Sequence, residues 1–306
     1  MCTAIIDRHF FGRTLDLEAS YGEKVVITGQ NYTFKFIHEG EIRHHYAMIG
    51  TAHIANGVPL YYDAANEMGL SAAALRFPKY AEYHDTRLGE VNLASFELIP
   101  WALCNFSSAA EAKRAMRSVT ITNDDFSDKL PSTPLHWIFA DKYESFIVES
   151  VNEGIKIYDA PEGILTNAPD FPSQREFLSK NNKIMLKACH IGKKNLDIAG
   201  DSSSPSRFIR AAYAKTHIIN CYEDRAAISR FFHLMDTVSQ PHGFAQNDSG
   251  APVLTVYTSC IDTERLIYYF TTYNNRQIRA VRLDKFDSDG LTVFTMESGE
   301  NITYIN

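Results

Sequence analysis

Several kinds of segment are missing from this chain of 306 residues, and each absence excludes a class of protein. No run of roughly eighteen apolar residues is present, so neither a transmembrane helix nor membrane insertion is expected. The N-terminus lacks the basic region and apolar core of a secretory signal, so we expect a cytoplasmic protein. The formal net charge of −7 argues against nucleic acid or an anionic membrane as a partner.

Disulfide and cofactor motifs are also absent. The five cysteines are dispersed without a CxxC pair, which favours reduced thiols over a disulfide framework. Neither a phosphate-binding GxxxxGK(S/T) loop nor a dinucleotide-binding GxGxxG loop occurs. His38, Glu39, His44 and His45 are metal-capable, but their spacing is typical of a hairpin turn and its flank. We therefore expect no metal and no other cofactor.

What is present is the pattern of a layered α+β protein. Hydrophobic residues make up 45% of the chain, enough for a large core. Along the chain the sequence patterns predict strands, then helices, then strands, helices and strands again. This order predicts one domain over residues 1–306, a four-layer αββα sandwich of two stacked antiparallel sheets between helix layers.

The expected elements follow from period and boundary signals. A helix over 93–103 is expected to be kinked or split by Pro100, and Ser108 with Glu111 forms a capping box for the next helix. Residues 79–92, 120–134 and 174–203 are expected to be loops, the last of them a long loop or lid. Further helices are predicted at 207–218 and 225–238, and strands at 24–28, 33–37, 46–49, 135–140, 145–149, 154–158, 163–167, 253–260, 266–273, 278–283 and 291–296.

The first residues carry the clearest chemical signal. Cys2 follows the initiator methionine, and its small side chain favours methionine removal, which would leave a thiol and a free α-amine on one carbon. Such an amine has a pKa of about 7.7–8.0 and can serve as a base for the thiol. The apolar, β-branched run from Cys2 to Ile6 favours a buried strand. The alternative is that Cys2 is a small hydrophobic core residue.

A second strand over Phe11-Gly12-Arg13-Thr14-Leu15-Asp16 returns Arg13 and Asp16 towards the start of the chain. The Met-Cys-Thr start followed by Phe-Gly-Arg-x-x-Asp resembles the choloylglycine hydrolase family of N-terminal-nucleophile amidases, which includes bile salt hydrolases and penicillin V acylases. The resemblance implies the fold of these hydrolases, with Cys2 as nucleophile and its own α-amine as proton acceptor.

The same resemblance assigns further catalytic residues. It implies that Arg13 lies against the nucleophile and that Asp16 binds the N-terminal amine. Thr166-Asn167-Ala168-Pro169 resembles the family segment whose asparagine amide helps to form the oxyanion hole, and Ser206-Arg207-Phe208 resembles the segment whose arginine reaches the site.

Each assignment has an alternative. Arg13 and Asp16 could form a surface ion pair, Asn167 could be a turn residue, and Arg207 could cap or decorate a helix. Arg13 and Asp16 are also three positions apart, so both can reach the site only if a bulge or strand end lies near Thr14.

One position departs from the family pattern. Arg76 precedes Phe77-Pro78, where bile salt hydrolases carry asparagine and penicillin V acylases carry tyrosine. The family uses the backbone N–H of this residue in the oxyanion hole, which any residue type supplies, and its side chain lines the substrate pocket. Arg76 is therefore a predicted substrate-binding residue; alternatively it pairs with an acid such as Glu67 or points to solvent.

The predicted function is hydrolysis of a linear amide in a small molecule, with conjugated bile salts preferred over penicillin V or another acyl amide. The opposing interpretation is a non-catalytic relative that binds sterol or acyl ligands. The resemblance also implies a homo-oligomer, a tetramer in this family.

Overall fold

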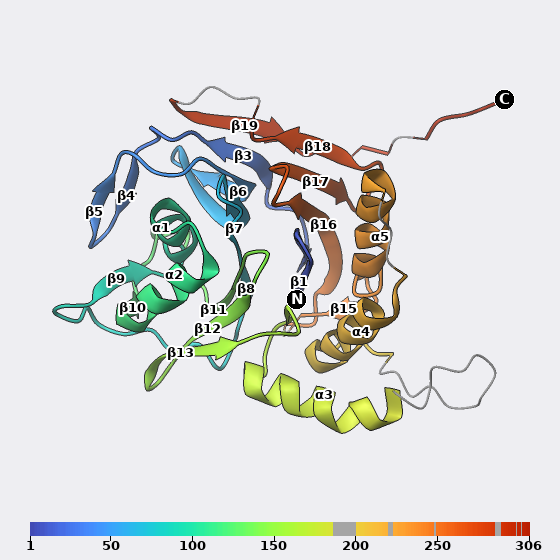
Figure 1. Ribbon diagram of the computed structural model, residues 1–306, viewed down its shortest axis with the longest axis horizontal. Coiled ribbons are helices and arrows are strands. Elements are labelled where there is room, and N and C mark those ends of the chain that lie inside the picture. Colours follow the sequence, from blue (N-terminus) through green and yellow to red (C-terminus); the bar gives the residue numbers. More distant parts are fainter. Residues whose placement is uncertain (186–199, 220–222, 248, 285–288, 298, 301) are drawn as a thin grey trace.

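The computed structural model describes residues 1–185, 200–219, 223–247, 249–284, 289–297, 299–300 and 302–306. Two antiparallel β-sheets lie face to face in these ranges, and helices cover their outer faces (Figure 1). No helix in the described ranges is long and apolar enough to cross a membrane.

The first sheet has seven strands and contains the N-terminal strand next to its edge. Every pairing in it is antiparallel, with an additional short strand, β15 (Ala245–Gln246), beside β16. Its order is β14 (Ile164–Leu165), β1 (Cys2–Asp7), β2 (Phe10–Leu17), β16 (Pro252–Asp262), β17 (Ile267–Thr272) and β18 (Arg279–Arg282).

The second sheet has eight strands, and all its pairings are also antiparallel. Its order is β13 (Gly154–Asp159), β12 (Ser145–Val151), β11 (Leu135–Ala140), β8 (Ser71–Arg76), β7 (Val58–Asn66), β6 (Met48–Ala55), β3 (Lys24–Thr28) and β19 (Leu291–Thr295). Two separate pairs complete the strands: antiparallel β4 (Phe34–Phe36) with β5 (Gly40–Ile42), and parallel β9 (Val91–Ala94) with β10 (Val119–Thr122).

Helices form the two outer layers. α1 (Leu98–Asn105) and α2 (Ala109–Ala115) pack on the eight-stranded sheet, whereas α4 (Ser204–His217) and α5 (Asp224–Asp236) pack on the seven-stranded sheet (Figure 1). α3 (Phe171–Met185) lies against α4, and a 3₁₀ turn (Met116–Ser118) follows α2. The predicted αββα arrangement is confirmed. Because each sheet is covered on both faces, all six residues of β1 are buried.

Two sequence predictions between residues 91 and 122 are wrong. The expected helix over 93–103 begins only at Leu98, since Val91–Ala94 pairs with Val119–Thr122 as a two-stranded parallel sheet. These strands overlap the ends of the loops expected over 79–92 and 120–134 and the start of that helix. Pro100 does not kink α1, because it lies in the first turn, where its missing N–H would have no intrahelical partner.

The predicted loop or lid over 174–203 is wrong for residues 174–185, whereas residues 200–203 form no helix or strand, as expected. Residues 171–185 form α3, and residues 186–199 lie outside the described ranges. The helix buries Phe171, Gln174 and Leu178, which are spaced three and four positions apart, on one face. Its other positions are mostly Ser, Lys, Asn, Glu and Arg, which concealed this narrow stripe in the sequence.

The predicted capping box of α2 is present in altered form. Ser108 is the N-cap and its Oγ accepts from Glu111 N (3.4 Å), as expected. The carboxylate of Glu111, however, accepts from the main-chain N (3.0 Å) and the hydroxyl (2.8 Å) of Ser107, one residue earlier than the capping box requires.

Gly12 allows the close approach of β2 to its neighbours, next to Arg13. A Cβ atom at this position would lie 2.1 Å from the carbonyl oxygen of Ser259 in β16 and 2.7 Å from the ring of Phe231 in α5. The nearer atom belongs to the main chain, so a flexible side chain cannot relieve the overlap.

We therefore expect Gly12→Ala to lower the free energy of unfolding by about 1–3 kcal/mol or more, the cost of overpacking. Gly290→Ala is the matched control, because a Cβ there would have no heavy atom within 4 Å. Urea unfolding of both variants checks the prediction. Equal stabilities would show that β2 and β16 can separate without cost.

Candidate active site

Cys2 is the first residue of β1 and is buried, with 1% of its surface exposed. Met1 continues the strand pairing beyond it: the Met1 ammonium donates to Asp16 O (2.6 Å), and Asp16 N donates to Met1 O (2.9 Å). The described form therefore carries its N-terminus one residue before Cys2, opposite Asp16.

Asn167 and Arg207 surround the main chain of Cys2. Cys2 N donates to Asn167 Oδ1 (2.6 Å), and Arg207 Nη2 donates to the same oxygen (2.8 Å). Arg207 Nη1 also donates to Cys2 O and to Thr3 Oγ1 (2.6 Å). Since Oδ1 accepts two hydrogen bonds, the amide orientation is fixed and Nδ2 must face the other way. Asn167 and Arg207 are thus buried, and both bind the main chain of Cys2.

Asp16 supports the N-terminus mainly through its main chain. Its carboxylate is fully buried and accepts from Thr255 Oγ1 (2.7 Å) and Thr14 Oγ1 (3.2 Å). Burial raises the pKa of this carboxyl group, and the N-terminal amine, Arg207 and the two hydroxyl groups oppose that rise.

Arg13 joins the two sheets beneath Cys2. Its Nη1 donates to Tyr62 O (2.9 Å) and Ala74 O (2.7 Å) of the opposite sheet, and it has no exposed surface. Burial alone would lower the pKa of its guanidinium group, but the charges of Cys2, Tyr257, Asp63 and Asp16 outweigh burial and raise it. Arg13 therefore remains charged beside Cys2.

Arg13 and Asp16 reach the site from opposite faces of β2, and neither is on the surface. β2 pairs with β1 without interruption, so the expected bulge near Thr14 is absent; the irregularity lies in the partner strand β16, between Thr255 and Tyr257. Arg13 and Asp16 can both act at Cys2 because Cys2 is the first residue of β1. Its side chain lies on one face of the strand, and its main-chain nitrogen lies at the beginning of the strand.

The main chain of Arg76 faces Asn167. Phe77 N donates to Pro134 O beside β8 (2.8 Å), so the N–H and C=O of Arg76 point to the opposite edge of that strand. Pairing between β7 and β8 stops at Ala73, and Asn167 Nδ2 donates to Arg76 O (2.8 Å) at this open edge. The N–H of Arg76 and the amide of Asn167 therefore lie on one side, as the predicted oxyanion hole requires.

The Arg76 side chain is exposed and does not pair with Glu67, whose carboxylate accepts from Gln30 Nε2 and Ala47 N. The electrostatic partners of Arg76 are in the β2–β3 loop. The hydrogen bond from Tyr21 lowers the pKa of Glu18, and the positive charge of Arg76 adds a smaller effect in the same direction.

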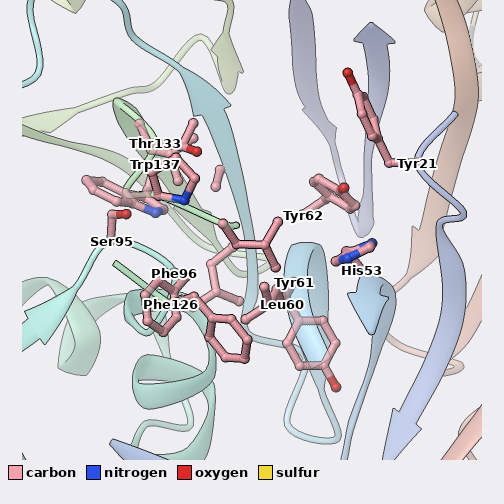
Figure 2. Close-up of a pocket in the computed structure, with 15 residues that line it drawn as sticks. Tyr21, His53, Leu60, Tyr61, Tyr62, Ser95, Phe96, Phe126, Thr133 and Trp137 are labelled. Carbon is pink, nitrogen blue, oxygen red and sulfur yellow. The ribbon is translucent and has the colours of Figure 1, made fainter. Parts of the chain in front are cut away.

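A cavity of about 220 Å³ lies next to Tyr21 of the β2–β3 loop (Figure 2). Ala74 and Tyr62, whose carbonyl oxygens bind Arg13, line it, and the charge of Cys2 contributes to raising the pKa of the Tyr62 hydroxyl after burial and Glu23. Trp137 is fully buried in its wall, and its Nε1 has no hydrogen-bond partner among the described residues. The other lining residues are mostly aromatic or aliphatic: Tyr21, His53, Leu60, Tyr61, Ser95, Phe96, Ile99, Phe126, Leu130, Pro131, Thr133 and Leu135.

The model of the linear amide C–N hydrolases of the choloylglycine hydrolase family matches residues 2–298. The chain belongs to the choloylglycine hydrolase family. It is accordingly an enzyme of the linear amide C–N hydrolase type. Within the described residues, no group of three or more His, Cys, Asp or Glu side chains could hold a metal ion.

Relatives of known structure and function resemble the chain over its whole length. It is 39% identical to the bile salt hydrolase/transferase of Lactiplantibacillus plantarum, over 100% of both chains. The solved structure of a variant of conjugated bile acid hydrolase from Clostridium perfringens is 29% identical over 100% of both chains, with a TM-score of 0.90. Penicillin V acylase from Agrobacterium tumefaciens shares the fold, with a TM-score of 0.78 and 19% identity over 96% of this chain and 90% of that one.

Sequence reasoning missed the buried polar groups behind Arg13. Asp63 accepts from Tyr257 Oη (2.5 Å), Tyr268 Oη (2.8 Å) and Ser259 Oγ (3.1 Å), all of them buried. The sequence signal was a single acid, Asp63, inside the run Val58-Pro-Leu-Tyr-Tyr-Asp63-Ala-Ala. A charge buried within an otherwise uncharged strand requires hydrogen-bond or ionic partners.

The site predicts how the thiols differ in reactivity. Burial raises the pKa of the Cys104 and Cys260 thiols well above the ordinary value, whereas Cys2 has the charged Arg13 beside it and becomes terminal once Met1 is removed. We expect iodoacetamide to modify Cys2 first, as peptide mapping by mass spectrometry would reveal. Faster modification of Cys104 or Cys260, with the Cys2→Ala variant as the control, would contradict this site. Cys189 and Cys221 lie outside the described residues.

Proposed function

We propose that the protein hydrolyses the amide bond of glycine- or taurine-conjugated bile salts, with Cys2 as its N-terminal nucleophile. The observation that carries the proposal is the convergence of Arg13, Asn167 and Arg207 on Cys2, beside a largely apolar cavity. Removal of Met1 would expose the thiol and create the α-amine where Asn167 Oδ1 already accepts from Cys2 N.

The first step forms a thioester. The α-amine takes the proton of the Cys2 thiol, and the sulfur attacks the amide carbonyl carbon. The charge that develops on the carbonyl oxygen is stabilised by the N–H of Arg76 and by Asn167 Nδ2, which has a second hydrogen besides the one it donates to Arg76 O. The C–N bond then breaks as the ammonium group returns its proton to the leaving nitrogen, which releases glycine or taurine.

The second step restores the enzyme. Water attacks the thioester carbonyl while the α-amine accepts a proton from it, and the same two donors bind the oxyanion again. The C–S bond breaks, the bile acid leaves as a carboxylic acid, and the ammonium group reprotonates the thiolate. Arg13 and Arg207 keep their charges throughout and hold the main chain around Cys2.

The cavity supports a bulky apolar acyl group with few polar atoms. Its aromatic walls suit a steroid, and Trp137 Nε1, which has no hydrogen-bond partner among the described residues, can donate to an oxygen on it. Two relatives that match 100% and 96% of this chain are named bile salt hydrolase/transferase and conjugated bile acid hydrolase, at 39% and 33% identity. Penicillin V remains the alternative substrate, supported by a solved acylase of the same fold. A homotetramer and a cytoplasmic location stay predictions of the resemblance and the sequence.

The decisive assay is amine release from glycocholate, taurocholate and penicillin V. We expect turnover of the bile salts by the wild type, none by Cys2→Ala, and a large loss in Cys2→Ser, because the serine hydroxyl is far less acidic than the thiol. Unchanged unfolding curves for both variants serve as the control. Bile-salt binding without amine release would instead identify a non-catalytic relative.

Arg76 should influence which anions are preferred. A guanidinium group at the mouth of the site can bind the carboxylate or sulfonate of the leaving group. A charge-assisted hydrogen bond contributes about 1.5–3 kcal/mol, so Arg76→Asn and Arg76→Tyr should lower kcat/KM for the preferred conjugate about tenfold or more. Arg87→Asn, in a polar loop, is the matched control. If the ratio of kcat/KM between substrates stays within about twofold of the wild type, Arg76 interacts with Glu18 and Tyr21 and does not bind the substrate.

A further inference from the structure

His136 is a buried titratable residue that the reaction described above does not use. It lies in β11 and has no exposed surface. Its Nε2 is 2.8 Å from Thr166 O, and its Nδ1 is 3.3 Å from Glu149 Oε1. A carbonyl oxygen can only accept, so Nε2 carries the hydrogen and donates it to Thr166.

The ring of His136 also contacts the other side of the site. It stacks on Phe77, with ring centroids 4.3 Å apart and planes inclined by 9°. Phe77 follows Arg76 directly, and Thr166 precedes Asn167 directly. One side chain therefore touches the neighbours of both predicted oxyanion donors.

We infer that His136 is a positioning residue that sets the separation and angle of the two halves of the oxyanion hole, Arg76–Phe77 and Thr166–Asn167. The halves come from different sheets, because Arg76 ends β8 and Asn167 follows β14. Asn167 Nδ2 and Arg76 O join them directly at one point (2.8 Å). A single hydrogen bond permits rotation about itself, and the contacts of His136 supply the second point that removes this freedom.

The surroundings of His136 fix its ring. Glu149 Oε1 accepts from Phe171 N (2.9 Å) and lies 3.3 Å from His136 Nδ1, so the start of α3 holds the carboxyl group beside the ring. Gln174 and Ser204 also bind the Asn167 segment, through Asn167 O (2.6 and 2.7 Å), but within the described part of the chain their hydrogen bonds reach only that half. His136 differs from them because it contacts both halves.

Three substitutions separate the two contacts. His136→Phe keeps a ring that can stack on Phe77 and removes the donor, His136→Gln keeps a donor and removes the ring, and His136→Leu removes both. Misplacement of about 1 Å can cost a hundredfold in rate, so kcat should fall about tenfold to a hundredfold in His136→Leu and less in the other two. KM should stay within about twofold, because the substitution alters alignment with the transition state and not the cavity.

The matched control is His45→Phe. His45 is another buried histidine whose ring nitrogens lie 2.7 Å from main-chain carbonyl oxygens, those of Tyr46 and Tyr32, and it packs on Phe34. Its hydrogen bonds and ring contacts with other described residues do not involve the site, so kcat should not change. Iodoacetamide modification of Cys2 and urea unfolding, measured for every variant, report whether the nucleophile and the fold are intact.

The inference is supported if kcat falls while Cys2 modification, unfolding and KM stay close to the wild type. It is overturned if all folded variants keep kcat within about twofold of the wild type, or if kcat falls only in proportion to folded protein. His136→Phe and His136→Gln decide the outcome if His136→Leu does not fold. The inference rests on the proposed function: if the wild type releases no amine, both fail, whereas an active wild type with unaffected variants overturns the positioning role alone.

Discussion

The buried guanidinium group of Arg13 is the interaction on which the site depends. It lies between the two sheets and donates to Tyr62 O and Ala74 O at the edge where β7 and β8 no longer pair. These carbonyl groups would otherwise be buried without a partner, at a cost of about 1–3 kcal/mol each. Arg13 thus satisfies the open edge, connects the sheets and places a fixed positive charge beneath Cys2.

A buried cation requires buried anions, and the surrounding charges follow from this requirement. Asp63, held by three hydroxyl groups, and Asp16, held by two threonines, lie near Arg13 or the N-terminus. Burial lowers the pKa of Arg207, while Asp16 and Cys2 oppose this effect. In the site, the buried cations Arg13 and Arg207 and the buried carboxylates Asp16 and Asp63 thus compensate one another.

Much of the fold and of the candidate site could be predicted from the amino-acid sequence. Alternating apolar runs identified most strands, and the N-terminal Cys2 with Arg13, Asn167 and Arg207 gave the chemistry, because these residues stand within recognisable local motifs. The parallel pair β9–β10 was not predictable, since neither strand shows a clear pattern without the other. α3 was missed because its apolar stripe is narrow and its exposed faces are polar.

Long-range pairings were the other limit. The sequence offered Glu67 as a partner for Arg76, but Glu67 binds Gln30 and Ala47, and Arg76 acts on Glu18 across the β2–β3 loop. The roles of Asp63 and His136 depend on which residues the opposite sheet brings near, and no local spacing encodes that information. Tyr257 and Ser259 share a face of β16, yet only the fold shows that this face meets Asp63.

The most direct test of the account is to trap the acyl group on the enzyme. Wild-type protein would be mixed with excess glycocholate, quenched rapidly in acid and digested, and its N-terminal peptide analysed by mass spectrometry. The account predicts a peptide that begins at Cys2 and carries the cholyl group on sulfur, removable by hydroxylamine as a thioester is. Full turnover by protein that retains Met1, or an acyl group attached to any other residue, would contradict it.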